Sequence, residues 1–125
     1  MNLTVREEAG IRFLEGPPGE PLFRSIDDAS RLVESCFSNK VRCAILYAPN
    51  LTARFFDLSS GEAGAILQKI RQYRIRFAVV CAPGSVQFST RFVEMAEEEA
   101  RGKHFRVVES TDAAREWLAA TVEVN

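Results

Sequence analysis

The sequence contains few of the residues that commonly carry chemistry, and each scarcity narrows the functions open to it. The single histidine, His104, cannot form a multi-histidine metal site, and no G-x-S-x-G motif supplies a nucleophile for it to activate. The three cysteines, Cys36, Cys43 and Cys81, are widely spaced and lack a C-x-x-C pair, which argues against zinc and against a disulfide framework. We therefore expect buried, reduced cysteines, no metal and no cofactor.

Long apolar runs and a one-sided charge are missing as well. No apolar run approaches the length that crosses a bilayer, and the first residues lack the basic start and apolar core of a signal peptide. The net charge of −1, with a pI near 5.9, gives no sign of the basic surface typical of nucleic-acid binding. We expect a cytoplasmic protein without a membrane or nucleic-acid partner.

Apolar residues are plentiful, and they predict a single packed domain over residues 1–125. Hydrophobic residues make up 46% of the chain, which has nine phenylalanines, so one core of ordinary size can be built. No internal repeat or low-complexity segment divides the chain.

Two periodicities alternate along the chain and indicate an α/β fold. Short alternating segments at 3–6 and 11–14, with Gly10 in the turn between them, are typical of a β-hairpin. Buried strands are expected at 41–47, 75–82 and 105–108. Helices are expected from an N-cap at Ser25 to about 37, from Ser59 through a buried face that ends at Tyr73, from 86 or 89 to 101, and from a cap at Thr111. Alternating strands and helices predict one mixed sheet whose later strands are parallel.

The most distinctive segment is the strand-to-helix turn at residues 55–64. Phe55 and Phe56 are expected to end an extended segment, where adjacent side chains point to opposite faces, so that one faces the core and the other solvent or a partner. Ser59 and Glu62 have the spacing of a capping box. Because helix starts expose unpaired N–H groups and partial positive charge, they often contact anions or partners.

Each polar or small residue of this turn has a structural and a functional interpretation. Asp57 either bonds the local backbone or acts as a carboxylate at the ends of parallel strands. Ser59 and Ser60 either cap the helix or receive a phosphoryl group, and the two roles are compatible. Gly61 and Gly64 have a G-x-x-G spacing, which is a weak phosphate-loop signal, and close packing of helix on sheet is the other explanation for Gly64.

Several segments of the chain resemble a small bacterial family known only as a domain of unknown function, DUF4180. The resemblance covers nearly the whole chain, and its core is Phe55-Phe56-Asp57-Leu58, then Ala63-Gly64-Ala65-Ile66-Leu67-Gln68-Lys69, then Tyr73-Arg74-Ile75-Arg76-Phe77-Ala78-Val79-Val80. The chain departs from the family pattern at Cys81-Ala82-Pro83-Gly84, where the family tends to carry Gly-Asp-Phe, and at Glu97-Glu98-Glu99.

The layout of the turn is also similar to that of anti-sigma-factor antagonist (STAS-like) domains. Those domains place an Asp-Ser-Ser-Gly segment at a helix start, and here Leu58 interrupts the step from Asp57 to Ser59. The resemblance implies a STAS-like sandwich, a protein partner and phosphorylation of Ser59 or Ser60.

Two functions are compatible with these observations. The first is a non-catalytic regulatory or protein-interaction domain that uses Phe55, Phe56, Asp57, Ser59, Ser60, Gly61 and Gly64. The second is a small-ligand (anion) binding protein or modest enzyme, with Asp57 in a cleft and the N–H groups of residues 60–62 holding the anion. We favour the first because no complete catalytic constellation is present. A homodimer through an apolar helix face is compatible with both.

Overall fold

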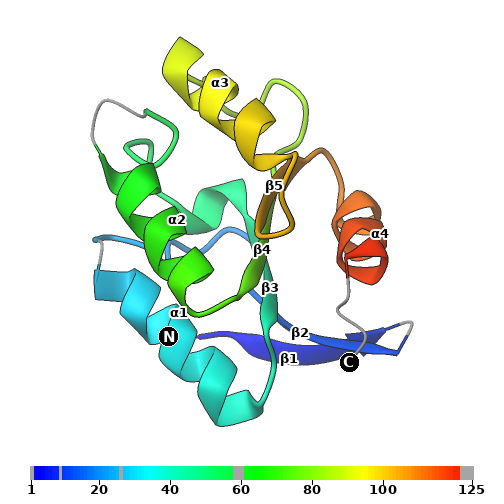
Figure 1. Ribbon diagram of the computed structural model, residues 1–125. Coiled ribbons are helices and arrows are strands. Elements are labelled where there is room, and N and C mark those ends of the chain that lie inside the picture. The colour runs from blue at the N-terminus through cyan, green and yellow to red at the C-terminus, as the bar shows by residue number, and fades with distance from the viewer. Residues whose placement is uncertain (1, 9, 26, 58–60, 122–125) are drawn as a thin grey trace.

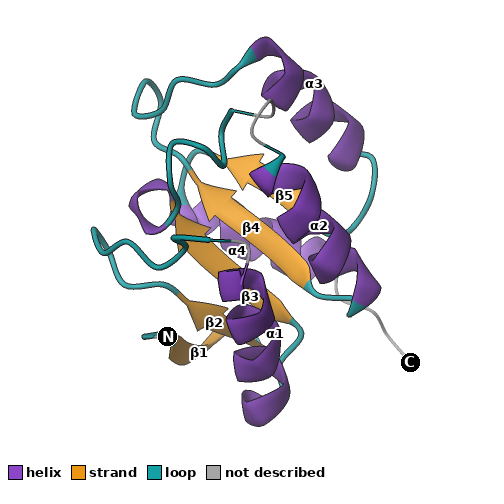
Figure 2. Cartoon of the chain, turned by 90° about the vertical axis from the view of Figure 1, so that its left-hand side faces the viewer, coloured by secondary structure: helices purple, strands orange, loops and turns teal. Residues whose placement is uncertain are grey.

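The computed structural model describes residues 2–8, 10–25, 27–57 and 61–121 of the 125-residue chain. These residues form one five-stranded sheet between two helical layers, seen nearly edge-on in Figure 1 and face-on in Figure 2. The elements are β1 (Thr4–Glu8), β2 (Ile11–Glu15), α1 (Asp27–Asn39), β3 (Cys43–Tyr47), the 3-10 helix η1 (Ala48–Asn50), α2 (Glu62–Gln72), β4 (Arg76–Val80), α3 (Thr90–Glu99), β5 (Phe105–Val108) and α4 (Thr111–Ala120).

The sheet is mixed, as the alternation of strands and helices predicts. Its strands lie in sequence order from β1 to β5. β1 and β2 form the expected antiparallel hairpin, in which Val5 lies opposite Leu14. Gly10 in its turn has a φ of 77°, a left-handed conformation that glycine adopts without steric cost. The strands from β2 to β5 are all parallel.

Alternate residues of the central strands pack into two separate hydrophobic cores, one on each face of the sheet. The face toward α1, α2 and α3 carries Ala44, Leu46, Phe77 and Val79, and the face toward α4 carries Cys43, Ile45, Ala78 and Val80. In Figure 2, α1 and α2 lie in front of the sheet and α4 lies behind it. Because helices cover both faces, the parallel strands are nearly continuous apolar runs in the sequence.

Every crossover between parallel strands passes over the same face of the sheet. The crossovers are right-handed, and each one leads to the next strand in the same direction along the sheet. All three connecting helices, α1, α2 and α3, must therefore lie on the same face of the sheet. The chain reverses only after β5, when α4 folds back over β3, β4 and β5. The loops that follow β2, β3 and β4 therefore lie next to one another at the carboxyl edge of the sheet.

The start of α1 differs from the expectation. The helix begins at Asp27, two residues after the predicted N-cap Ser25. The carboxylate of Asp28 accepts hydrogen bonds from the amides of Arg24, at 2.7 Å, and Ser25, at 3.1 Å. This buried carboxylate in the first turn thus satisfies two amides that precede the helix, and it also suits the positive end of the helix dipole.

Serine hydroxyls do cap the last two helices. The Ser89 hydroxyl accepts a hydrogen bond from the Phe92 amide at 3.1 Å, which confirms the later of the two predicted starts for α3. In α4 the cap is Ser110 rather than Thr111, and its hydroxyl accepts from the Ala113 amide at 3.1 Å. The expected cap was therefore displaced by one residue.

The second helix has the expected buried face except at its end. Ala63, Ile66, Leu67 and Ile70 are buried, but Tyr73 is the C-cap and 36% of it is exposed. The helix ends at Gln72, so Tyr73 does not belong to the buried helical face that the sequence pattern predicted for it.

The C-termini of α1 and α2 share one unusual geometry. Each helix ends in a Schellman motif. In α1 the Val41 amide donates to the Cys36 carbonyl, and in α2 the Ile75 amide donates to the Ile70 carbonyl, both at 3.0 Å. The residues before these closing amides, Lys40 and Arg74, both have a φ of 56°. Glycine is usual at this position, and a residue with a Cβ pays roughly 1–2 kcal/mol there. Both helices keep a long cation at a cost in stability.

The three cysteines are buried and free, as expected. Burial raises the pKa of the Cys36 thiol to about 12 and that of Cys81 to about 11. Both side chains are therefore neutral thiols near pH 7. None of the helices in the described ranges is long and apolar enough to cross a membrane.

Candidate functional site

A hollow of about 870 Å³ opens at the carboxyl edge of the sheet, over the ends of β3 and β4. Three consecutive loops surround it, namely those after β2, β3 and β4. The residues that line this carboxyl-edge hollow are Pro18, Gly19, Tyr47, Ala48, Pro49, Leu51, Ala53, Phe56, Asp57, Val80, Ala82, Ser85, Val86, Gln87, Phe88 and Ser89. Open α/β sheets bind their ligands outside the carboxyl ends of the strands, so this is the place where a site is expected.

The side chain of Asn50 fixes the shape of two of these loops. It is fully buried, and its Oδ1 accepts a hydrogen bond from the Tyr47 amide at 2.7 Å. Its Nδ2 donates to the carbonyl oxygens of Pro17 and Glu20, both at 2.7 Å. A buried amide with both donors satisfied is stabilising, and here it holds the loop after β2 against the end of β3.

The loop after β2 reaches Asn50 only because residue 16 has no side chain. A Cβ on Gly16 would lie 2.4 Å from Asn50 Oδ1 and 2.8 Å from Leu46 Cδ2. The Gly16 amide also donates to the Ile45 carbonyl at 3.0 Å. This close approach brings Pro18 and Gly19 to the rim of the hollow.

One wall of the hollow is aromatic. Phe56 packs edge-to-face on Phe88 with 5.7 Å between ring centroids, and Phe88 stacks on Phe92 of α3 at 5.4 Å. The Ser89 amide donates to the Phe56 carbonyl at 3.2 Å, which ties the loop after β4 to the loop after β3. The two loops thus form one continuous apolar surface.

The polar groups of the hollow are few. Asp57 is exposed, and among the described lining residues it alone carries a formal charge at pH 7. No lysine or arginine from the described ranges lines the hollow. The described lining therefore combines a mostly apolar surface with one carboxylate and a few neutral polar groups.

Tyr47 supplies a neutral hydroxyl at the end of β3. Its oxygen lies 3.2 Å from Glu15 Oε2, to which it donates, and 3.1 Å from Thr111 Oγ1. Partial burial is the main reason that the pKa of the Tyr47 phenol is raised, so the group stays protonated at neutral pH. These contacts hold the ring at the edge of the hollow.

Phe55 and Phe56 do not lie in an extended segment, and the expectation that one of them faces solvent is wrong. Residues 53–56 form a turn, and both rings are buried, with 1% and 3% exposed. They pack edge-to-face at 5.2 Å, since a turn can bring adjacent side chains together where a strand would separate them. Both rings belong to the core, and Phe56, together with Asp57, also lines the hollow.

The start of α2 also differs from the expectation. The helix begins at Glu62, and its N-cap is Gly61 with a φ of 78°. The sequence instead predicted a helix start at Ser59, two residues before this N-cap. Ser59 and Ser60, the two predicted phosphorylation sites, lie outside the described residues.

The two glycines of the G-x-x-G spacing lie away from the hollow. Neither Gly61 nor Gly64 is among its lining residues. Gly64 is exposed, and a Cβ there would meet nothing within 4 Å, so close packing of helix on sheet does not explain it. The described residues of the segment 55–64 are therefore divided between core, hollow and outer surface.

In the part of the chain that the structure describes, no group of three or more His, Cys, Asp or Glu side chains is placed to hold a metal. His104 immediately precedes β5, at the sheet edge opposite the hollow, and its carbonyl accepts a hydrogen bond from the Phe77 amide at 2.7 Å. The histidine is thus distant from Asp57 in the fold.

Sequence reasoning missed Tyr47 and the whole loop after β4. A usable signal was present, because Pro83-Gly84 ends one buried run just as Pro49-Asn50 ends the previous one. The ends of adjacent parallel strands meet at one edge, so the residues after both runs were candidates for the same site.

The model of a family described as a domain of unknown function (DUF4180) matches residues 8–118. The matched range includes every described residue that lines the hollow. No curated protein and no solved structure matches the chain.

Proposed function

The chain belongs to the DUF4180 family of domains of unknown function, and we propose that it binds a small ligand with an apolar or aromatic body in the carboxyl-edge hollow. The observation that carries the proposal is the hollow of about 870 Å³ with its wall of Phe56 and Phe88. Small-molecule sites are typically largely apolar hollows of about 300–1,000 Å³ with a few placed polar groups.

Asp57 supports a choice among ligand charges. As the one formally charged group in the described lining, it favours a cationic or neutral head group over an anionic one. The proposal therefore differs from the anion site expected from the sequence. That expectation relied on helix amides at residues 60–62, and Gly61 does not line the hollow.

A matched series of small aromatic compounds tests this proposal. Phenethylamine, phenethyl alcohol and hydrocinnamate share a ring and a short linker but carry a cationic, a neutral and an anionic head. We expect the amide resonances of Val80 to Ser89 to shift on titration, with affinity in the order cation, neutral, anion. The Asp57→Asn substitution should remove a cation preference of roughly two- to fivefold, as for an exposed ion pair.

Filling the hollow provides the control for position. Ala82 lines the hollow and is exposed, so Ala82→Phe should weaken all three compounds with little effect on folding. Ala119→Phe adds the same ring to the exposed side of α4 and should change nothing. Equal binding by both variants, or an affinity order led by the anion, would rule out the proposed site.

The regulatory role implied by the STAS-like resemblance stays a prediction, as do the cytoplasmic location and a homodimer. The regulatory role loses the support of exposed aromatics in the turn, because Phe55 and Phe56 are buried. Intact-mass measurement of protein purified from its own host tests the remaining element, phosphate on Ser59 or Ser60.

A further inference from the structure

On the far side of the molecule from the hollow, two aromatic rings are in contact and open to solvent. Phe37 near the end of α1 is 54% exposed and Tyr73 at the end of α2 is 36% exposed. Their rings meet edge-to-face with 5.6 Å between centroids. Exposed aromatics are enriched at protein interfaces, and a pair already in contact offers a ready apolar surface.

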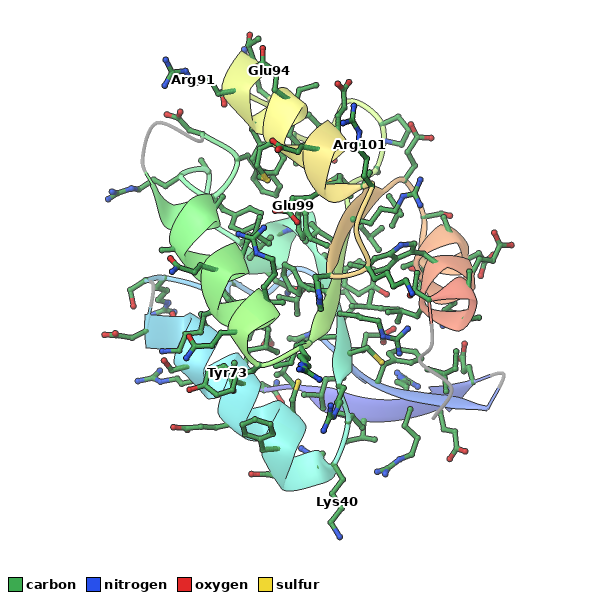
Figure 3. All side chains as sticks on the ribbon, viewed as in Figure 1. Lys40, Tyr73, Arg91, Glu94, Glu99 and Arg101 are labelled. Carbon is green, nitrogen blue, oxygen red and sulfur yellow. The ribbon has the colours of Figure 1, made fainter. Side chains whose placement is uncertain are left out.

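The two turns that carry this pair lie side by side and bear exposed cations. The Arg42 carbonyl accepts a hydrogen bond from the Arg76 amide at 2.8 Å, which joins the start of β3 to the start of β4. Figure 3 shows Lys40 extending away from the protein at the end of α1 and Tyr73 beside the same helix. We call the following five exposed residues the basic aromatic surface: Phe37, Lys40, Arg42, Tyr73 and Arg74.

The charge of this surface is not neutralised internally. Among the described residues, no carboxylate forms a salt bridge with Lys40, Arg42 or Arg74. Glu34, one helical turn before Phe37, is an exposed acid on the same helix. Three cations against one carboxylate leave the surface positive on a protein whose net charge is −1.

Two of the three cations are kept in a conformation that favours glycine. Lys40 and Arg74 occupy equivalent positions in two adjacent Schellman motifs, both with a φ of 56°. Strained backbone of this kind concentrates at functional sites, and here it occurs twice beside the exposed aromatic pair. Glycine at both positions would relieve the strain but would also remove two of the three positive charges.

We propose that the basic aromatic surface docks an acidic segment of a partner protein, with carboxylates toward the three cations and an apolar side chain against Phe37 and Tyr73. Three cations neutralise too few phosphates for a nucleic-acid site of ordinary strength. Anionic lipid recognition usually draws on about four to eight clustered cations. A short acidic segment matches both the number of charges and the small apolar contact.

Fluorescence anisotropy with a labelled random copolymer of glutamate and tyrosine tests the proposal at low salt. The chain should bind the copolymer more tightly than poly-glutamate, and added salt should weaken the binding because the charges are exposed. The Lys40→Gly/Arg74→Gly variant removes two charges while relieving backbone strain. It should bind roughly fivefold more weakly while unfolding at a higher temperature. Phe37→Ser/Tyr73→Ser should reduce copolymer binding to the poly-glutamate level.

The matched control removes two cations elsewhere. Arg24 and Arg91 are exposed, and Figure 3 shows Arg91 at the opposite end of the molecule from Lys40, so Arg24→Ala/Arg91→Ala should leave copolymer binding unchanged. An equal loss in this control, or full binding by the glycine variant, would overturn the proposal. Tighter binding of oligo(dT) or of phosphatidylserine vesicles than of the copolymer would also overturn it, in favour of a nucleic acid or a membrane.

Discussion

At the scale of single residues, Gly16 and Asn50 hold the loop after β2 in place. Asn50 is buried without a charge, and its amide satisfies two carbonyls and one amide of the backbone. Gly16 leaves the space that the amide needs. The hollow depends on residues that do not line it, because they position the loops that do.

Two glycine substitutions should have opposite effects on stability. Gly16→Ala places a Cβ 2.4 Å from Asn50 Oδ1 and should lower the free energy of unfolding by about 2 kcal/mol or more. Gly64→Ala, on an exposed face of α2 with nothing within 4 Å, should raise it by about 0.5–1 kcal/mol. Urea denaturation of the two variants measures both. A loss at Gly64 equal to that at Gly16 would show that close approach is not the cause.

The Asn50→Asp substitution should be strongly destabilising although it preserves shape. A carboxylate cannot donate to the carbonyls of Pro17 and Glu20, and its charge would be buried among acceptors. We expect a loss of roughly 3–5 kcal/mol near neutral pH. The loss should shrink as pH falls, because burial raises the carboxyl pKa and protonation restores one donor. Urea denaturation at two pH values, with Asn2→Asp at an exposed site as control, tests this.

At the scale of elements, the ends of α1 and α2 show stability given up for side-chain chemistry. Both helices keep a cation in the left-handed position that closes a Schellman motif. The same motifs start β3 and β4, since the residues that follow lead directly into those strands. The turns are therefore well defined even though their central residue is strained.

Lys40→Gly and Arg74→Gly should each stabilise the protein. Relief of roughly 1–2 kcal/mol of strain exceeds the added entropy of glycine in the unfolded chain, so a net gain of about 0.5–1 kcal/mol is expected. Lys40→Ala and Arg74→Ala lose the same charges but keep the strain, and we expect little change for them. Thermal denaturation of the four variants separates strain from charge, and equal stability of the glycine and alanine variants would contradict the assignment.

At the scale of the whole molecule, winding the chain over one face decides where the loops gather. Because the strands run in sequence order, three successive loops adjoin at the carboxyl edge and enclose the hollow. The amino edge instead receives the ends of α1 and α2, with their exposed aromatics and cations. The two proposed binding surfaces lie at opposite ends of the same sheet.

Because the thiols are buried, the free energy of unfolding of the whole protein should fall at alkaline pH. The pKa of Cys36 is raised in the folded state from 9.0 to about 12. The neutral thiol therefore contributes to the free energy of unfolding below the unfolded pKa, and this contribution is lost as pH rises from the unfolded to the folded pKa. Between about pH 8 and about pH 10, Cys36 alone should lower the free energy of unfolding by about 1.4 kcal/mol. Urea denaturation of the wild type and Cys36→Ala should show their stabilities converging by this amount, and parallel pH curves would contradict it.

Local patterns in the sequence determined the elements and the two-sided burial of the sheet. The hairpin, the apolar runs of β3 to β5 and the helical stripes follow from the spacing of apolar residues, and the strand at Phe105–Val108 was located to the residue. Resemblance along the chain also identified the family, which the match over residues 8–118 confirms. These features depend on near neighbours, so periodicity is enough to find them.

Only the tertiary structure decided which residues share a site. Phe55 and Phe56 are adjacent in sequence and both pack in the core, because a turn replaces the expected strand, yet only Phe56 of the two also lines the hollow. Phe37 and Tyr73 meet across two helices, and Gly16 meets Asn50 across a strand and a helix. Such contacts join residues that are far apart along the chain, and no local pattern encodes the distance between them.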